Sequence, residues 1–247
     1  MIGLVTLLSD FGTADGYVGE MKGALISRGV ERLVDIAHDI AAQDVDGARL
    51  ALARYWRRFP EGTVHLVVVD PGVGGTRAAI AVESEHRFLV GPDNGVLSPA
   101  LLHPDARCVT LAVPTNASPT FHGRDVFAPA AALLATGTTL DALGEPLGTP
   151  VVRRTPEAVR RADGAVRGVV ITIDRFGNAV TNLMARRGGT IELAGLALPI
   201  RRTYGDAPAD APLALVGSSG LVEIAVRDGS AAARFGLQRG SEVVLRV

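Results

Sequence analysis

The chain has 247 residues, 47% of them hydrophobic, which is enough for one large packed domain or two modest ones. Its formal net charge of -1 argues against a basic nucleic-acid-binding face and against an acidic tail. The single cysteine, Cys108, excludes an intrachain disulfide, and no apolar run approaches the roughly 20 residues of a membrane span. The chain opens into a strand without a charged leader, so we expect a soluble cytoplasmic protein.

Strands and helices are expected to alternate over the first 150 residues. Apolar and β-branched runs predict strands at 2–8, 34–36, 64–69, 78–82, 88–90 and 108–113. Helices are predicted from about 15 to 27 with Asp15 as the cap, at 44–59, near Ser98, and at 124–135. This alternation predicts a three-layer α/β domain whose mostly parallel sheet is covered on both faces.

The composition changes near Pro150. Residues 151–164 are polar and irregular, and we predict that they link a domain at 1–150 to a smaller one at 165–247. The second domain is predicted to contain strands at 166–174, 179–183, 190–193, 198–203, 213–216, 221–226 and 243–247. Short strands separated by regular turn signals favour a small all-β sandwich or barrel.

The most informative segment, residues 67–77, reads VVVDPGVGGTR. An apolar strand ends at Asp70, and a loop with three glycines leads to Arg77. Because open α/β sheets bind ligands at the carboxyl ends of their strands, we expect Asp70 and Arg77 to face each other across a pocket. A surface turn with an ordinary ion pair is the alternative. The Walker spacing and its lysine are absent, so the segment is not a phosphate loop.

Two further polar positions are expected near strand ends. Asp10 follows the first strand, where a carboxylate either binds vicinal ribose hydroxyls or caps the loop. His122 lies in an irregular segment beside Arg124 and Asp125. A lone histidine is more often structural, but a group of aspartate, arginine and histidine can hold and polarise a water molecule.

Asp35 and His38 suggest a metal site, with Asp70 and His122 as further ligands. Their spacing matches no strong metal motif, and the segment is typical of a strand that runs into a turn. We therefore expect no metal.

Two turns of the second domain carry polar or aromatic side chains. Phe176 can stack on a purine, and the amide of Asn178 can pair with an adenine edge; the alternative is a hairpin with its turn at residues 177–178. Residues 217–220 (GSSG) offer hydroxyl and N–H groups to a carboxylate, or form an ordinary hairpin turn.

Taken together, these segments resemble one family along almost the whole chain. They are LSDFGT at 8–13 with DGY at 15–17, DIAH at 35–38, VDPGVGG at 69–75 with Arg77, GPDNG at 91–95, FHGRD at 121–125, IDRFGN at 173–178 and GSSG at 217–220. The chain is similar to S-adenosyl-L-methionine (SAM) hydroxide adenosyltransferases, which are adenosine-forming SAM hydrolases related to the SAM-dependent fluorinase and chlorinase. The resemblance implies an N-terminal α/β domain, a C-terminal β-barrel, and a homotrimer with SAM bound between neighbouring subunits.

The reaction implied by the resemblance is attack of water or hydroxide on the ribose C5′, which expels methionine and leaves adenosine. Because the sulfonium is already a good leaving group, no metal or other cofactor is implied, and the enzyme has to position and desolvate the nucleophile. The positions that match the water-activating residues are Asp70, Arg77 and His122. The positions that match substrate-binding residues are Asp10 for the ribose, Phe176, Asn178 and Tyr204 for the adenine, and Asp174, Ser218 and Ser219 for the methionine, with Asp15 and Glu223 as weaker matches.

Departures from the halogenating relatives indicate water as the nucleophile. Asp70 replaces a tyrosine and would repel a halide, residues 122–123 (HG) replace a tyrosine and a small halide-binding residue, and the fluorinase insertion after Glu83 is absent. Gln43 replaces a tryptophan that contacts the adenosyl group. The alternatives are a SAM- or adenosine-binding protein with little turnover and, less favoured, a halogenase. A nicotinamide oxidoreductase is disfavoured because the first turn lacks GxGxxG.

Overall fold

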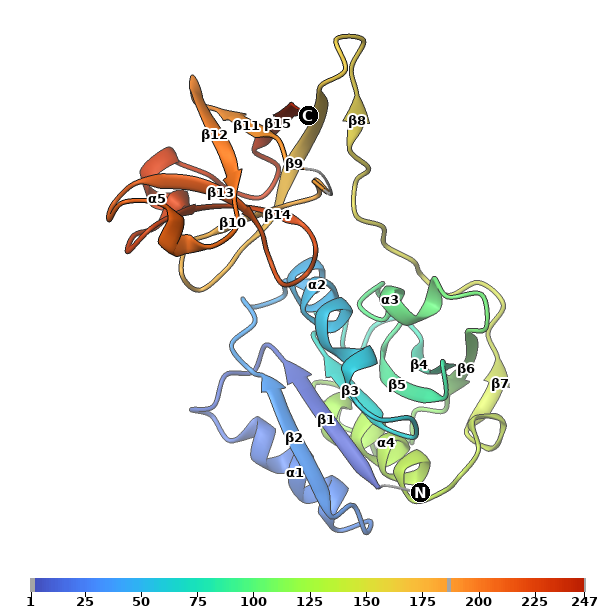
Figure 1. The fold of residues 1–247 in the computed structure, drawn as a ribbon. Coiled ribbons are helices and arrows are strands. Elements are labelled where there is room, and N and C mark those ends of the chain that lie inside the picture. Colours follow the sequence, from blue (N-terminus) through green and yellow to red (C-terminus); the bar gives the residue numbers. More distant parts are fainter. Residues whose placement is uncertain (1–2, 186–187, 247) are drawn as a thin grey trace. The chain divides into compact units, whose positions relative to one another are not determined.

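The computed structural model describes residues 3–185 and 188–246 (Figure 1). It divides into two compact units, Met1–Arg154 and Thr155–Val247, and this division falls inside the segment predicted as a linker. None of the described helices is long and apolar enough to cross a membrane.

The first unit alternates strands and helices, as the sequence predicts. Its strands are β1 (Leu4–Ser9), β2 (Arg32–Ala37), β3 (Val64–Val68), β4 (Ala79–Ser84), β5 (Arg87–Pro92), β6 (Arg107–Leu111) and β7 (Gly144–Pro146). Its helices are α1 (Tyr17–Ile26), α2 (Val45–Tyr55), α3 (Ser98–Leu101) and α4 (Ala128–Ala135), with 3-10 turns at Trp56–Arg58 and Leu140–Ala142 and a π-helical turn at Gly123–Phe127.

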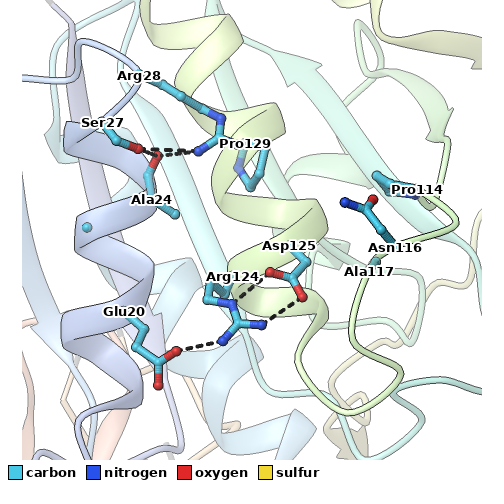
Figure 2. A pocket seen from close by; sticks show the side chains of 11 residues that line it. Glu20, Ala24, Ser27, Arg28, Pro114, Asn116, Ala117, Arg124, Asp125 and Pro129 are labelled. Carbon is cyan, nitrogen blue, oxygen red and sulfur yellow. Dashed lines mark hydrogen bonds and ion pairs between the residues drawn. The ribbon is translucent and has the colours of Figure 1, made fainter.

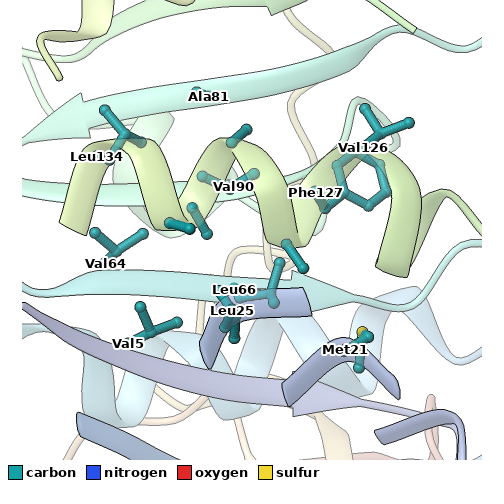
Figure 3. Close-up of a cluster of buried hydrophobic side chains, with 14 of the residues drawn as sticks. Val5, Met21, Leu25, Val64, Leu66, Ala81, Val90, Val126, Phe127 and Leu134 are labelled. Atoms are coloured by element: carbon teal, nitrogen blue, oxygen red, sulfur yellow. The ribbon is translucent and has the colours of Figure 1, made fainter. Parts of the chain in front are cut away.

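Two apolar layers sandwich the sheet of this unit. One core joins α1 and α4 to one face of the strands, and Figure 3 shows side chains such as Phe127 and Leu134 packed over Leu66 and Val90. A second core joins α2 and α3 to the opposite face. Each fully buried Leu or Phe contributes about 1.5–3 kcal/mol. The predicted three-layer α/β architecture is confirmed.

The sheet has the strand order β2-β1-β3-β5-β4-β6-β7 and is mixed rather than mostly parallel. The pairings from β2 through β5 are parallel, whereas β5–β4, β4–β6 and β6–β7 are antiparallel. The reason is local. Glu85 and His86 both have positive φ, which is the backbone of a two-residue hairpin turn, and they join β4 directly to β5.

The predicted cap of the first helix is wrong. α1 begins at Tyr17, and its N-cap is Gly16, with φ of 79° and no side-chain capping bond. Glycine adopts this left-handed conformation without strain, so the chain enters the helix there. Asp15 lies exposed just before the helix and has no capping role.

The second unit is built from short strands around its own core. They are β8 (Val159–Arg160), β9 (Val166–Ile173), β10 (Ala179–Thr181), β11 (Thr190–Leu193), β12 (Leu196–Arg201), β13 (Pro212–Val216), β14 (Val222–Val226) and β15 (Glu242–Arg246), with a 3-10 turn at Tyr204–Asp206 and helix α5 (Ala231–Phe235). The strand order is β10-β14-β13-β12-β11-β15-β9-β8, and a further pairing of β10 with β9 closes seven of the strands into a barrel. Of the two predicted architectures, the barrel is the one that forms.

His65 on β3 is a fully buried histidine in the first unit. Its Nδ1 lies 2.8 Å from Oγ1 of Thr6, and the rings of Tyr55 and Phe59 pack edge-on against it. Burial, reinforced by the positive charge of Arg87, lowers the pKa of His65 from 6.5 to about 3. The folded protein therefore holds this ring neutral.

This buried ring predicts acid sensitivity. Between pH 6.5 and about 3 the unfolded chain protonates His65 and the folded protein does not, so the free energy of unfolding falls as the pH drops, by about 1.4 kcal/mol per pH unit from this residue. Urea unfolding at pH 7.5 and 5.5 should show a smaller pH-dependent loss for His65→Gln than for the wild type. The exposed His86→Gln serves as the control and should keep the wild-type slope. An equal slope in all three proteins would contradict the assignment.

Candidate active site

Asp70, Arg77 and His122 form one buried group. Asp70 lies just past the end of β3, where Arg77 binds it with both arms of its guanidinium: Nε donates to Oδ1 at 2.9 Å and Nη2 donates to Oδ2. Nη2 also lies 2.9 Å from Nδ1 of His122. The side chains of Asp70 and Arg77 are only 5% and 11% exposed. The surface ion pair considered above is therefore a buried, bidentate pair, which holds its carboxylate far more rigidly than an exposed one.

The glycines of the loop serve the packing of this group. Gly74 has φ of +73°, and a Cβ there would collide with the carbonyl oxygen of Pro119. A Cβ at Gly72 would lie 3.2 Å from Cγ of Arg77. The lack of a side chain at these glycines thus allows the loop to pack against the segment that precedes His122 and against Arg77 itself.

The hydrogen bond from Arg77 fixes the protonation of His122. A guanidinium only donates, so Nδ1 of His122 accepts and the ring proton lies on Nε2. Burial and next the positive charge of Arg77 lower the pKa of His122, against the opposing effect of nearby carboxylates. His122 is therefore a neutral imidazole that carries its proton on Nε2. Within the described residues, Nη1 of Arg77 is buried without a hydrogen-bond partner.

Asn94 is a supporting residue that the sequence analysis missed. Its Nδ2 donates to the carbonyl of Val69 at 2.9 Å, and its Oδ1 accepts from the backbone N–H of Val96 at 3.1 Å. The amide thereby holds the peptide that directly precedes Asp70. The available signal was the motif at 91–95, which the sequence analysis used for the family resemblance without giving Asn94 a role.

Asp10 lies at the same edge of the sheet. It follows β1, which pairs in parallel with β3 so that Ser9 lies opposite Val68. The backbone N–H of Gln43 donates to Oδ2 of Asp10 at 2.7 Å. The adjacent Phe11 packs edge-on against Phe121, the neighbour of His122, at 5.8 Å between ring centroids.

In the second unit, Asp174 organises the turn between β9 and β10. Its Oδ1 accepts from the backbone N–H groups of Phe176 and Asn178, and its Oδ2 accepts from Nδ2 of Asn178, all at 2.9 Å. The hairpin considered as the alternative is present. Its turn nevertheless carries Phe176, 76% exposed, and Asn178, 5% exposed, into one pocket with Tyr204. The pocket has a volume of about 750 Å³.

The remaining predicted residues lie around the β13–β14 turn. Ser218 and Ser219 are exposed in this turn, where Gly220 donates its N–H to the carbonyl of Gly217. A Cβ at Gly217 would collide with the carboxylate of Glu223. Glu223 is 5% exposed and accepts a hydrogen bond from the Tyr204 hydroxyl at 3.1 Å.

Another pocket, of about 510 Å³, lies in the first unit and contains none of the predicted site residues (Figure 2). Arg124 lies in it between two carboxylates: Nη1 donates to Glu20 at 2.7 Å and Nε to Asp125 at 2.7 Å.

No group of three or more His, Cys, Asp or Glu among residues 3–185 and 188–246 is arranged to hold a metal ion.

Comparison with known proteins places this architecture and these motifs in one enzyme family. Residues 5–144 match the SAM hydroxide adenosyltransferase N-terminal domain, and residues 168–244 match the C-terminal domain of the same family. The chain belongs to the SAM hydroxide adenosyltransferase family, which confirms the resemblance seen in the sequence.

Individual relatives agree with that placement. The chain is 43% identical to a Thermus thermophilus protein named (R)-S-adenosyl-L-methionine hydrolase, over 98% of each chain, and 38% identical to one of the same name from Salinispora arenicola, over 97% of this chain and 96% of that one. A fluorinase of Actinopolyspora mzabensis is 28% identical, over 97% and 96% of the two chains. The crystal structure of an uncharacterized conserved protein from Thermotoga maritima has a TM-score of 0.89 at 30% identity, covering 99% of this chain and all of that one.

The contact between Arg77 and His122 predicts a shift that NMR can measure. Replacing Arg77 with Gln removes a positive charge beside the ring and leaves the Asp70 carboxylate, so the pKa of His122 should rise. Histidine ring protons would be titrated and the His122 signal assigned by its absence from His122→Gln. The exposed Arg107→Gln is the charge-matched control and should leave the titration unchanged. A His122 pKa that is the same in the wild type and Arg77→Gln would rule out this electrostatic coupling.

Proposed function

We propose that this chain hydrolyses SAM to adenosine and L-methionine by attack of water or hydroxide on the ribose C5′. The observation that carries the proposal is the buried group of Asp70, Arg77 and His122 in a chain 36–43% identical, over nearly its whole length, to proteins named SAM hydrolases. A buried carboxylate with directed donors beside it is suited to hold one water molecule in a fixed orientation.

For this reaction the protein has to do little more than hold the attacking water molecule in the correct orientation. The water oxygen forms a bond to C5′ while the C5′–S bond breaks. The electron pair of the C5′–S bond stays on sulfur, which leaves as the neutral thioether of methionine. The proton lost from the water passes to Asp70 or to solvent. Each Asp70 oxygen has a lone pair left after binding Arg77, and the Nε2–H of His122 can donate to the water oxygen. Because the sulfonium is the leaving group, we propose that no metal or other cofactor takes part.

The same group disfavours a halide as nucleophile. Asp70 brings a negative charge into a largely water-excluded site, where like charges repel much more strongly than in water. The positive charge of Arg77 is already paired with it, and His122 is neutral. An incoming anion therefore meets no uncompensated positive charge, whereas a water molecule meets a donor on His122 and an acceptor on Asp70.

For the substrate, we propose Asp10 as the partner of the ribose hydroxyls and the pocket of Phe176, Asn178 and Tyr204 as the adenine site. Asn178 keeps its Oδ1 and one amide proton for an adenine edge after its bond to Asp174. Matching positions in the family alone support Asp174, Ser218 and Ser219 as the binding site of the methionine. They also support Asp15 and Glu223 as weaker substrate-binding positions.

We also propose a homotrimer in which residues of neighbouring copies bind each SAM molecule. The family resemblance supports this assembly. So does the pocket that contains Phe176 and Tyr204, which are 76% and 44% exposed, because apolar surface gathered in one place is typical of an interaction site.

Incubation of purified protein with SAM tests the reaction. Chromatography is expected to show adenosine and methionine in equal amounts, with no 5′-halo-adenosine and no change in rate when chloride or fluoride is added. Intact SAM together with co-purified adenosine would instead support a binding protein. A 5′-halo-adenosine product would support a halogenase.

The role of Asp70 predicts a loss of turnover in Asp70→Asn. The amide keeps the size of the side chain but loses the charge that orients the water and takes its proton, so kcat should fall by at least about 100-fold. Adenosine affinity, measured by calorimetry, should change little, because Asp70 is not part of the proposed ribose or adenine sites. The exposed Asp141→Asn is the control. Turnover within a few-fold of the wild type would remove Asp70 from the mechanism.

A further inference from the structure

The motif at residues 35–38 takes no part in the chemistry described above, yet it holds a line of polar side chains through the first unit. Oγ of Ser9 lies 2.7 Å from Nδ1 of His38, and Nε2 of His38 lies 3.0 Å from Oδ1 of Asp35. Lys22 closes the line with an ion pair to Oδ2 of Asp35 at 2.6 Å. Ser9 is fully buried and His38 is 6% exposed. Buried polar groups cost stability unless they are paired, so a fully paired line of this kind has a defined geometry.

The direction of each hydrogen bond follows from chemistry. Burial by itself would raise the pKa of Asp35, but the hydrogen bonds from Lys22 and His38 outweigh it and hold that pKa below its usual value. Asp35 is therefore a carboxylate that accepts from Nε2 of His38. In the neutral ring, Nδ1 of His38 then accepts from the Ser9 hydroxyl, and this bond fixes both the ring and the serine rotamer.

This line is not a nucleophilic triad. Ser9 has no exposed surface, so its hydroxyl cannot reach a substrate atom. What it reaches is the loop that carries Asp10. Oγ of Ser9 also accepts from the backbone N–H of Phe11 at 3.5 Å, and the carbonyl of His38 accepts from the backbone N–H of Gly12 at 2.6 Å.

His38 therefore holds the loop on both sides of Asp10, by its ring at Ser9 and by its backbone at Gly12. The Gln43 N–H occupies Oδ2 of Asp10, and none of the described residues donates to Oδ1. One carboxylate oxygen is thus left for a ligand, and its direction is set by the loop.

We propose that Ser9, His38 and Asp35 are positioning residues that hold Asp10 in the orientation required to bind the vicinal hydroxyls of the ribose. The inference rests on the proposed function through the role of Asp10. It adds that recognition of the diol depends on the hydrogen bond between Ser9 and His38, and that neither residue touches the substrate.

Two variants of His38 separate its two bonds. An asparagine amide ends near the place of Nδ1, so His38→Asn can still accept the Ser9 hydroxyl but does not reach Asp35. A glutamine amide ends near the place of Nε2, so His38→Gln can still donate to Asp35 but leaves Ser9 unpaired. The two proteins thus differ in the bond that the proposal requires.

The probes are adenosine and 2′,3′-dideoxyadenosine, with affinities measured by calorimetry on the full chain. The wild type should bind adenosine more tightly, and this preference should fall by about tenfold in His38→Gln while His38→Asn keeps most of it. With SAM as the substrate, the loss in His38→Gln should appear in KM more than in kcat. A merely structural role would weaken both nucleosides equally and leave their ratio unchanged.

Ser9→Ala removes the same hydrogen bond from the other side and gives the same test where His38→Gln does not fold. An unchanged ratio in either folded variant overturns the proposal. So does a wild type that hydrolyses SAM but shows no preference for adenosine, and in that case the proposed function stands. A wild type that neither hydrolyses SAM nor binds adenosine overturns both.

Discussion

The buried pair of Asp70 and Arg77 is the constraint on which the candidate active site depends. A charge at 5% exposure is tolerable only because Arg77 binds both carboxylate oxygens, and breaking such a pair typically costs about 3–5 kcal/mol. The arginine in turn sets the tautomer of His122, and Gly74 of the same loop packs directly on Pro119, where a side chain would displace the loop. Loop, ion pair and imidazole therefore form one unit, and none of its parts has the same properties alone.

Much of this arrangement could be predicted from the sequence because its signals are local. The apolar run before Asp70 marks a buried strand, and carboxylates that follow neighbouring parallel strands meet at one edge, as Asp10 and Asp70 do. The ordered set of motifs identified the family. The hairpin at residues 85–86 was missed because neither residue there is the glycine or asparagine that usually signals positive φ. The bond from Asn94 to Val69 was missed because it joins residues 25 positions apart, which no local pattern reveals.

The two units position their predicted site residues by different means. In the first unit, Asp10 and Asp70 follow the ends of two neighbouring strands, β1 and β3. The Gln43 N–H and the Arg77 guanidinium then hold the two carboxylates by hydrogen bonds. In the second, the carboxylate of Asp174 folds the turn itself, and the exposed ring of Phe176 follows from that turn. Sequence reasoning found the chemistry of these residue types in both cases. It assigned Asp174 to the substrate by resemblance, and its three hydrogen bonds within the turn became visible only in three dimensions.

Closure of the barrel limits how the second unit can meet other chains. The pairing of β10 with β9 closes the sheet on itself, so the backbone groups of those strands already have partners. In the described part of this unit, the free end of the sheet is β8, a strand of two residues that includes an arginine. Short, charged edges are poor templates for an added strand. Association through this unit must therefore rely on contacts between side chains. Single substitutions can then change its affinity, and aggregation by the addition of strands to the sheet edge is disfavoured.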